Sequence, residues 1–146
     1  MKNEYLTHED QQILEYATTF EELRDVAFQV LYRMPRPIGQ VCGPIRSGGL
    51  SSIEKNVEEL ARAIARLRDS GVNIFDQTPF EKPMWRIIDT PHFRGGNHLL
   101  ETFYLPLFES GLVETLYFIP GWESSHGARW EHAQAERLWL DIVYLE

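Results

Sequence analysis

The chain contains a single cysteine, Cys42, so it forms no internal disulfide and offers no cysteine-rich zinc site. Basic residues are scarce as well: 14 Lys and Arg stand against 22 Asp and Glu, for a formal net charge of -8. A face that binds duplex nucleic acid needs an excess of positive charge, so we expect no nucleic-acid partner. The negative charge does not exclude a small anionic ligand, because a few backbone amides and one arginine can hold a phosphate.

Long apolar runs are also missing. No stretch approaches the length of a membrane span, and residues 1–10 lack the apolar core of a signal peptide, so we expect a cytoplasmic protein without a membrane partner. The histidines match no metal-ligand spacing on one helix face, and we expect neither a metal nor another cofactor. With 146 residues, of which 43% are hydrophobic, the chain is long enough to bury a core of its own.

Residues 1–34 predict two helices. Thr7 with Asp10 has the pattern of an N-cap and an acidic first turn, and either Thr18 or Thr19 can cap the second helix. The prolines that follow end this segment. We interpret residues 1–34 as an N-terminal helical extension, acting as a packing appendage or a dimer arm.

The rest of the chain alternates between strand and helix patterns. A strand at 38–42, a glycine-containing loop, a helix that opens with a capping box at Ser51 and Glu54 and stops near Gly71, and a strand at 72–75 form a βαβ unit. Such a unit requires a parallel sheet. A long loop is predicted next, at 76–97, and then a helix at 98–110 that Pro106 must kink or shorten. A strand at 113–119, a helix at 125–140 and a final strand at 142–145 complete the predicted elements. The predicted fold is a small doubly wound α/β sandwich.

The loop from Gly43 to Gly49 lies between a strand and a helix, where glycines let backbone amides approach a ligand. Arg46 can add a bidentate contact to a phosphate. The loop matches neither the Walker A pattern nor the dinucleotide fingerprint. A plain strand–helix connection explains it equally well.

The segment from Phe118 to Glu131 carries the strongest functional pattern. An apolar strand runs into a Pro-Gly turn, a short polar loop and a small-residue helix start, which is where open α/β sheets build ligand sites. Glu131 lies just inside that helix, and Trp122 and Trp130 flank it. A glutamate on a helix is usually a solvated surface residue, but a partly desolvated one in a cleft can act as nucleophile or acid/base.

The pattern Pro-Gly-Trp-Glu-x-Ser-x-Gly-Ala-x-x-Glu, at Pro120–Glu131, resembles the signature of the nucleoside 2-deoxyribosyltransferase-like superfamily, and of an often phage-associated branch in particular. The loop Cys42–Gly49 is similar to the phosphate-side loop of the 2′-deoxynucleoside 5′-phosphate N-hydrolases in that superfamily. The resemblance implies a Rossmann-like domain at residues 35–146, a homo-oligomer of at least two chains, and cleavage of the N-glycosidic bond of a nucleoside or its 5′-monophosphate.

The resemblance also implies roles for individual residues. Glu131 falls on the family's nucleophile. The implied substrate-binding residues are Gly43, Ile45, Arg46, Ser47, Gly48, Trp122, Ser125 and Gly127. A second acid would protonate the leaving base, and its candidates are Asp76, Asp89, Glu114 and Glu123. The family usually has Asp at the start of the third strand, where this chain carries Glu114.

Three functions remain open at this stage. The first is an enzyme in which water or a second base takes the sugar from Glu131, and an Arg46 contact to a 5′-phosphate favours hydrolysis over transfer. The second is a non-catalytic nucleotide-binding or sensing module of the same fold, since fold alone does not fix function. The third is a structural protein that assembles through residues 1–34.

Overall fold

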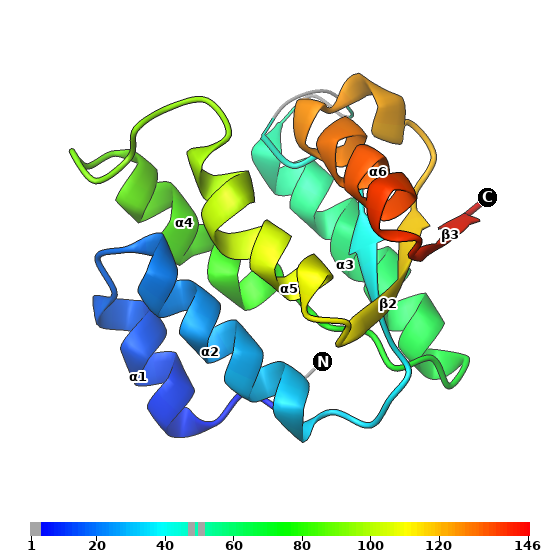
Figure 1. The fold of residues 1–146 in the computed structure, drawn as a ribbon, viewed down its shortest axis with the longest axis horizontal. Coiled ribbons are helices and arrows are strands. Elements are labelled where there is room, and N and C mark those ends of the chain that lie inside the picture. The colour runs from blue at the N-terminus through cyan, green and yellow to red at the C-terminus, as the bar shows by residue number, and fades with distance from the viewer. Residues whose placement is uncertain (1–3, 47–48, 50–51) are drawn as a thin grey trace.

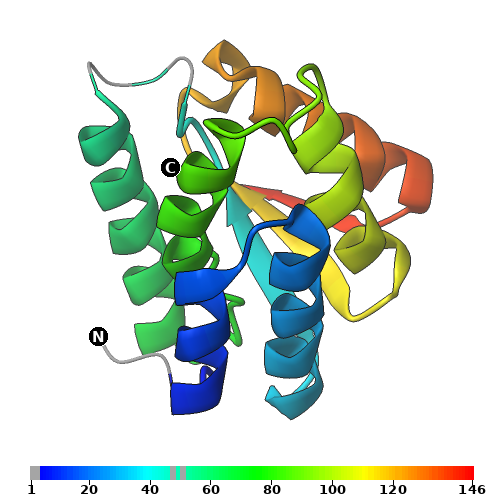
Figure 2. The ribbon, with the colours of Figure 1, turned by 90° about the vertical axis from the view of Figure 1, so that its left-hand side faces the viewer.

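A three-stranded, all-parallel sheet lies at the centre of the protein, in a computed structural model that describes residues 4–46, 49 and 52–146 (Figure 1). The strands, in spatial order, are β1 (Ile38–Cys42), β2 (Val113–Phe118) and β3 (Asp141–Tyr144). Helices cover both faces: α3 (Ile53–Asp69) packs on one side of β1, and helices from the second half of the chain pack on the other side of β2 and β3 (Figure 2). The predicted parallel α/β fold, with helices ahead of the first strand, is confirmed.

The N-terminal helices are α1 (His8–Tyr16) and α2 (Phe20–Arg33). The predicted cap of α1 is present as a full capping box, in which Thr7 Oγ1 accepts from the Asp10 N–H and Asp10 Oδ2 accepts from the Thr7 N–H. Thr19, rather than Thr18, caps α2 through the N–H of Glu22. The caps therefore place both helix starts within one residue of the sequence prediction.

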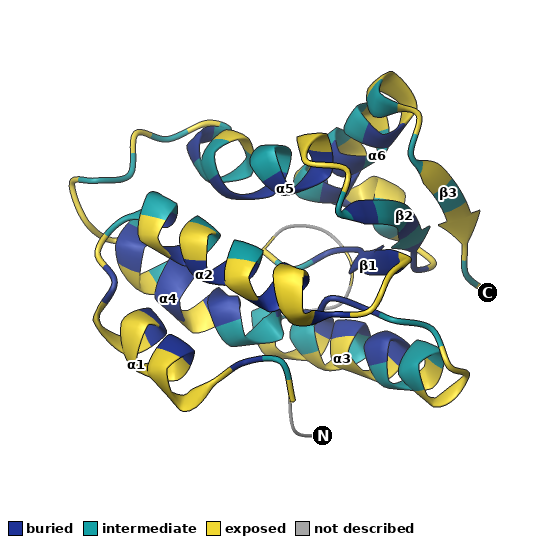
Figure 3. Ribbon diagram, turned by 60° about the horizontal axis from the view of Figure 1, so that its bottom comes forward, coloured by how far each residue is buried: buried dark blue, intermediate teal, exposed yellow. Residues whose placement is uncertain are grey.

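The N-terminal helices share one hydrophobic cluster with the sheet. Figure 3 shows α2 striped with buried and exposed residues, as expected for a helix that packs on one face. The Phe20 ring is fully buried and meets Phe93 and His98 edge-on, at centroid distances of 6.1 and 4.9 Å. The same cluster continues into β2 through Leu116 and Phe118. The described part of the N-terminal segment, residues 4–34, therefore completes the core that the sheet begins.

Replacing Phe20 by alanine should lower the free energy of unfolding by about 3–5 kcal/mol, because it removes a fully buried aromatic ring. The matched control is Tyr16→Ala on α1, where the side chain is 76% exposed and the change should stay within about 0.5 kcal/mol. Urea unfolding followed by circular dichroism measures both. Equal stabilities for the two variants would show that α2 is not part of the core.

Two predictions around α3 need correction. The helix is capped by Ser52, whose Oγ accepts from the Lys55 N–H, while the predicted cap Ser51 lies outside the described residues. Residues 72–75 do not form a strand of their own but a single parallel bridge between Ile74 and Gly39. The ladder stops because Asp76 turns the chain at once, accepting from the backbone and hydroxyl of Thr78.

The predicted long loop at 76–97 is wrong for its first half. It contains a short 3₁₀ turn, η1 (Thr78–Phe80), and the helix α4 (Glu81–Ile88). Pro79 and Pro83 are compatible with both elements because they lie in first turns, where a helix leaves backbone N–H groups without partners. Met84 and Ile87 are buried on the inner face of α4.

The predicted helix at 98–110 contains a π-helical stretch, η2 (Leu100–Tyr104), followed by α5 (Leu105–Glu109). The Leu105 N–H bonds to the carbonyl of Leu100, five residues back. Pro106 follows directly and has no N–H to continue an α-helical ladder, which explains why the wider turn ends there. The distortion predicted from Pro106 is present, as a π-turn.

The end of the chain follows the prediction closely. A 3₁₀ turn, η3 (Trp122–Ser124), leads to α6 (His126–Leu138), and Ser125 caps α6 through the Ala128 N–H.

No helix among the described residues is both long and apolar enough to cross a membrane. Ile74, which follows β1 in the chain, bridges to one side of β1, and the later strand β2 pairs with its other side. The order of the strands therefore reverses at β1. Ligand crevices form at the carboxyl ends of strands at such a point.

Candidate active site

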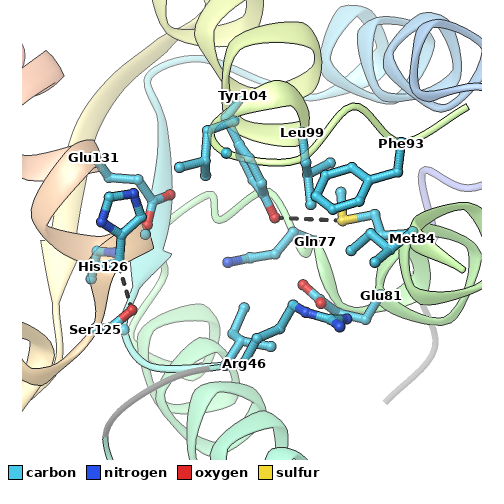
Figure 4. A pocket seen from close by; sticks show the side chains of 17 residues that line it. Arg46, Gln77, Glu81, Met84, Phe93, Leu99, Tyr104, Ser125, His126 and Glu131 are labelled. Carbon is cyan, nitrogen blue, oxygen red and sulfur yellow. Dashed lines mark hydrogen bonds between the residues drawn. The ribbon is translucent and has the colours of Figure 1, made fainter.

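A cavity of ≈ 210 Å³ opens at the carboxyl end of the sheet (Figure 4). Its walls come from the loop after β1, the η1–α4 segment, the chain from 93 to 104, and the first turns of α6. Most of the lining is apolar. The polar or charged lining residues are Arg46, Gln77, Glu81, Tyr104, Ser125, His126 and Glu131.

Glu131 lies on α6 and reaches the cavity from beside β1. Its side chain is only 7% exposed, and its Oε2 accepts a hydrogen bond from Gln40 Nε2 at 3.1 Å. Gln40 is two residues before Cys42 on β1, so both side chains point to the same face of the sheet. Burial is the largest effect on the pKa of Glu131 and raises it to about 8. The hydrogen bond with the Cys42 thiol lowers this pKa, the charge of Glu81 raises it, and the hydrogen bond from Gln40 lowers it. Glu131 is therefore a buried carboxyl group that lines the cavity, and its role as nucleophile stays a prediction.

Glu81, at the start of α4, is a second buried carboxyl group in the same cavity. It is 4% exposed, and burial raises its pKa to about 7 against the opposing effect of the Arg46 guanidinium. The Trp85 indole also lowers this pKa, although its N–H meets no acceptor at hydrogen-bond geometry among the described residues. Figure 4 shows the carboxyl groups of Glu81 and Glu131 on opposite sides of the cavity.

None of the four residues predicted as second acid lines this cavity. Asp76 is occupied by the turn to Thr78, and Asp89 is exposed at the end of α4. Glu114 lies near the start of β2, at the opposite end of the strand, where it pairs with Arg36 at 3.7 Å. Glu123 is exposed on η3.

Sequence reasoning missed Glu81 because its segment was interpreted as a loop. One signal was present: Glu81 precedes a Pro and an apolar run, the pattern of a helix start. A carboxylate at such a start, shortly after a segment predicted as a strand, is placed near the carboxyl end of the sheet.

The predicted substrate loop contributes part of the cavity rim. Gly43, Ile45 and Arg46 line the cavity, whereas Ser47 and Gly48 lie outside the described residues. A Cβ on Gly43 would come within 2.5 Å of the Ile119 side chain, so packing against the end of β2 requires this glycine. Gly49 N–H donates to Ser124 Oγ at 2.7 Å, which ties this loop to the turn that follows β2.

The N-terminus of α6 forms the opposite rim. Ser125, His126 and Gly127 all line the cavity. The N-terminus of this 13-residue helix favours negative charge, and its first N–H groups are able to hold an anion. His126 Nε2 lies 2.8 Å from Asn97 Oδ1, so the rim is linked to the chain between α4 and η2.

Trp122 does not line the cavity that holds Glu131. Its indole stacks on His132, with centroids 4.5 Å apart, and on Tyr144 at 6.1 Å, in a separate surface depression. Trp130 packs on Phe108 instead. The aromatic walls of the cavity are Phe93 and Tyr104.

Comparison with known proteins adds no assignment. No family model, no curated protein and no solved structure matches the chain. Function therefore has to be inferred from the side chains of the cavity.

The cavity holds two buried carboxyl groups, Glu81 and Glu131, whose pKa values lie near neutral pH, so the pair can supply both an acid and an anion. One can carry a proton while the other is ionised, which is the requirement for acid-assisted cleavage with a nucleophile. Among the described residues, no three His, Cys, Asp or Glu side chains gather into a group able to hold a metal ion. The positively charged groups at the rim, Arg46 and the α6 N-terminus, suit an anionic substituent on the substrate.

Proposed function

We propose that the protein cleaves the N-glycosidic bond of a nucleoside or deoxynucleoside 5′-monophosphate, with Glu131 as nucleophile and Glu81 as proton donor. The observation that carries the proposal is the pair of buried carboxyl groups facing one cavity at the carboxyl end of the sheet. Glycosidic cleavage passes through an oxocarbenium-like transition state, which one carboxylate stabilises while the other acid protonates the leaving group.

The pKa values alone, about 7 for Glu81 and about 8 for Glu131, put the first proton loss at Glu81. The hydrogen bonds of the pair act in the opposite direction and favour the proposed roles. Glu131 Oε2 accepts the N–H of Gln40, which fixes the carboxylate and favours its ionised form. Glu81 Oε1 has no hydrogen-bond donor among the described residues, which favours a proton on this carboxyl group, whereas the Arg46 guanidinium favours its ionised form. Positive charge that develops at the sugar next to Glu131 strengthens the preference.

The reaction then has two steps. Glu131 Oε bonds to C1′ as the bond from C1′ to the base nitrogen breaks, and the proton of Glu81 goes to the departing base. A water molecule next attacks C1′ and releases Glu131, while Glu81 takes up the proton of that water. If a second base attacks in place of water, the same intermediate gives transfer.

The rim supports a 5′-phosphate on the substrate. Arg46 can form two parallel hydrogen bonds to phosphate oxygens, and the Gly127 N–H belongs to the first turn of α6. The N–H of the cap residue Ser125 already donates to the Trp122 carbonyl at 3.0 Å. A substrate held there by its phosphate places its sugar toward the two carboxyl groups. We therefore propose hydrolysis of a monophosphate ahead of base transfer between nucleosides.

Chromatographic detection of free base after incubation with ribo- and deoxyribonucleoside 5′-monophosphates tests the proposal. We expect base release from at least one monophosphate, and less or none from the matching nucleoside. No release from any compound, even with a second base offered as acceptor, would favour the alternative of a non-catalytic nucleotide-binding module.

Activity should depend on pH as a bell-shaped curve with its maximum between about pH 7 and about pH 8. Below this range both Glu81 and Glu131 are protonated and no nucleophile is present. Above it both are ionised and no acid remains to protonate the base. Initial rates of kcat/KM from pH 5 to pH 10 measure the profile, and a flat profile across this range would contradict the paired roles.

A further inference from the structure

Tyr104 places a buried phenol hydroxyl in the cavity without a strong acceptor. Its side chain is 6% exposed, and the one hydrogen bond that its hydroxyl makes among the described residues goes to Met84 Sδ at 4.0 Å. A thioether is a weak acceptor, whereas buried tyrosine hydroxyls usually find a good one. The Tyr104 hydroxyl in the cavity wall is thus a hydrogen-bond donor with only a weak acceptor among the described residues.

Two aromatic neighbours pack against the ring that carries this hydroxyl. The Tyr104 ring meets Phe103 edge-on at 4.8 Å and lies 6.2 Å from the Phe108 ring. Tyr104 is also the last residue of the π-turn that precedes Pro106, and the extra residue in such a turn changes which side chains face inward. Figure 4 shows the hydroxyl between the carboxyl groups of Glu131 and Glu81.

Because the Tyr104 hydroxyl lies between the two carboxyl groups, its position determines which part of the substrate it can contact. Under the proposed function, Glu131 attacks C1′ from one side and Glu81 reaches the base nitrogen on the other. The atoms that lie between them belong to the furanose ring, whose ring oxygen and hydroxyl groups accept hydrogen bonds. Burial, with the charges of Glu81 and Glu131, raises the pKa of Tyr104 well above its ordinary value, so the phenol remains a donor throughout the active pH range.

We propose that the Tyr104 hydroxyl donates a hydrogen bond to the sugar of the bound substrate. This inference rests on the proposed function, and it makes Tyr104 a catalytic residue alongside the two carboxyl groups. A purely structural tyrosine would contribute only its ring to the apolar wall, and removing its hydroxyl would leave kinetics unchanged.

The variant Tyr104→Phe removes only the hydroxyl and keeps the ring packing. We expect kcat/KM for base release to fall about tenfold or more, with an unchanged melting temperature, because one hydrogen bond to the reacting sugar is lost. The matched control is Tyr117→Phe on β2, which loses the same hydroxyl outside the cavity and should keep wild-type kinetics. Wild-type kinetics in Tyr104→Phe would overturn the inference.

Binding of 2-deoxyribose 5-phosphate and ribose 5-phosphate, measured by calorimetry, separates this inference from the proposed function. These compounds carry the sugar and phosphate without a base, so their affinity does not require turnover. If wild type releases no base, the proposed function fails. The sugar contact still predicts about tenfold weaker binding of one of these compounds to Tyr104→Phe. Equal affinities for both proteins, or no binding to wild type, would overturn it.

Discussion

Replacing Glu131 by glutamine should lower kcat for base release by about 10⁴-fold or more, in the range seen when single members of a catalytic unit are removed. Glutamine keeps the volume of the side chain and cannot act as an anionic nucleophile. Substrate should still bind with nearly the wild-type Kd, because Arg46 and the α6 N-terminus are unchanged. Single-turnover base release and calorimetric binding measure the two quantities separately.

The smaller variant Glu131→Ala allows a second test of the same role. It leaves space beside C1′, and added azide should enter that space, restore base release and form a glycosyl azide. The control is Glu123→Gln on η3, an exposed carboxylate outside the cavity, which should behave as wild type. A Glu131→Gln protein that keeps more than a tenth of wild-type kcat would rule Glu131 out as nucleophile.

Replacing Glu81 by glutamine should lower kcat/KM by about 10²–10⁴-fold for natural nucleotides, the usual contribution of a general acid. The loss should nearly vanish with 4-nitrophenyl 2-deoxyriboside 5-phosphate, because nitrophenolate leaves without needing a proton. The falling limb of the pH profile above about pH 8 should disappear as well. Parallel rate measurements on the two substrates give the comparison directly.

Asp89→Asn is the matched control for Glu81, since it removes an exposed carboxylate at the other end of the same helix. It should leave both substrates unaffected. Equal losses on both substrates in Glu81→Gln would remove Glu81 from the role of proton donor. A leaving-group dependence found instead in Glu131→Gln would exchange the two roles.

Local signals in the sequence predicted much of the fold. The capping pattern at Thr7 and Asp10 and the Ser125 cap of α6 depend on residues three apart, so they are visible without tertiary information. Glu131 could be placed for the same reason: it lies at a fixed distance from a helix start that follows a strand. The parallel sheet followed from the order of strands and helices.

The second carboxyl group could not be found in this way. Glu81 and Glu131 are brought together by the packing of α4 and α6 around the same cavity, and no periodicity links residues so far apart in the chain. Prolines at positions 79 and 83 also hid α4, because prolines in first turns resemble those of loops. Trp122 was misplaced because neighbours in sequence around a tight turn can point to opposite sides.

Mass spectrometry of the acid-quenched protein tests the paired-carboxylate account most directly. The wild-type protein is mixed with the monophosphate that releases base most readily, quenched within one turnover and digested. We predict that the peptide containing Glu131 gains the mass of one sugar phosphate, and that this adduct is absent from Glu131→Gln. Base release without an adduct, or an adduct on the peptide containing Glu81, would contradict the account.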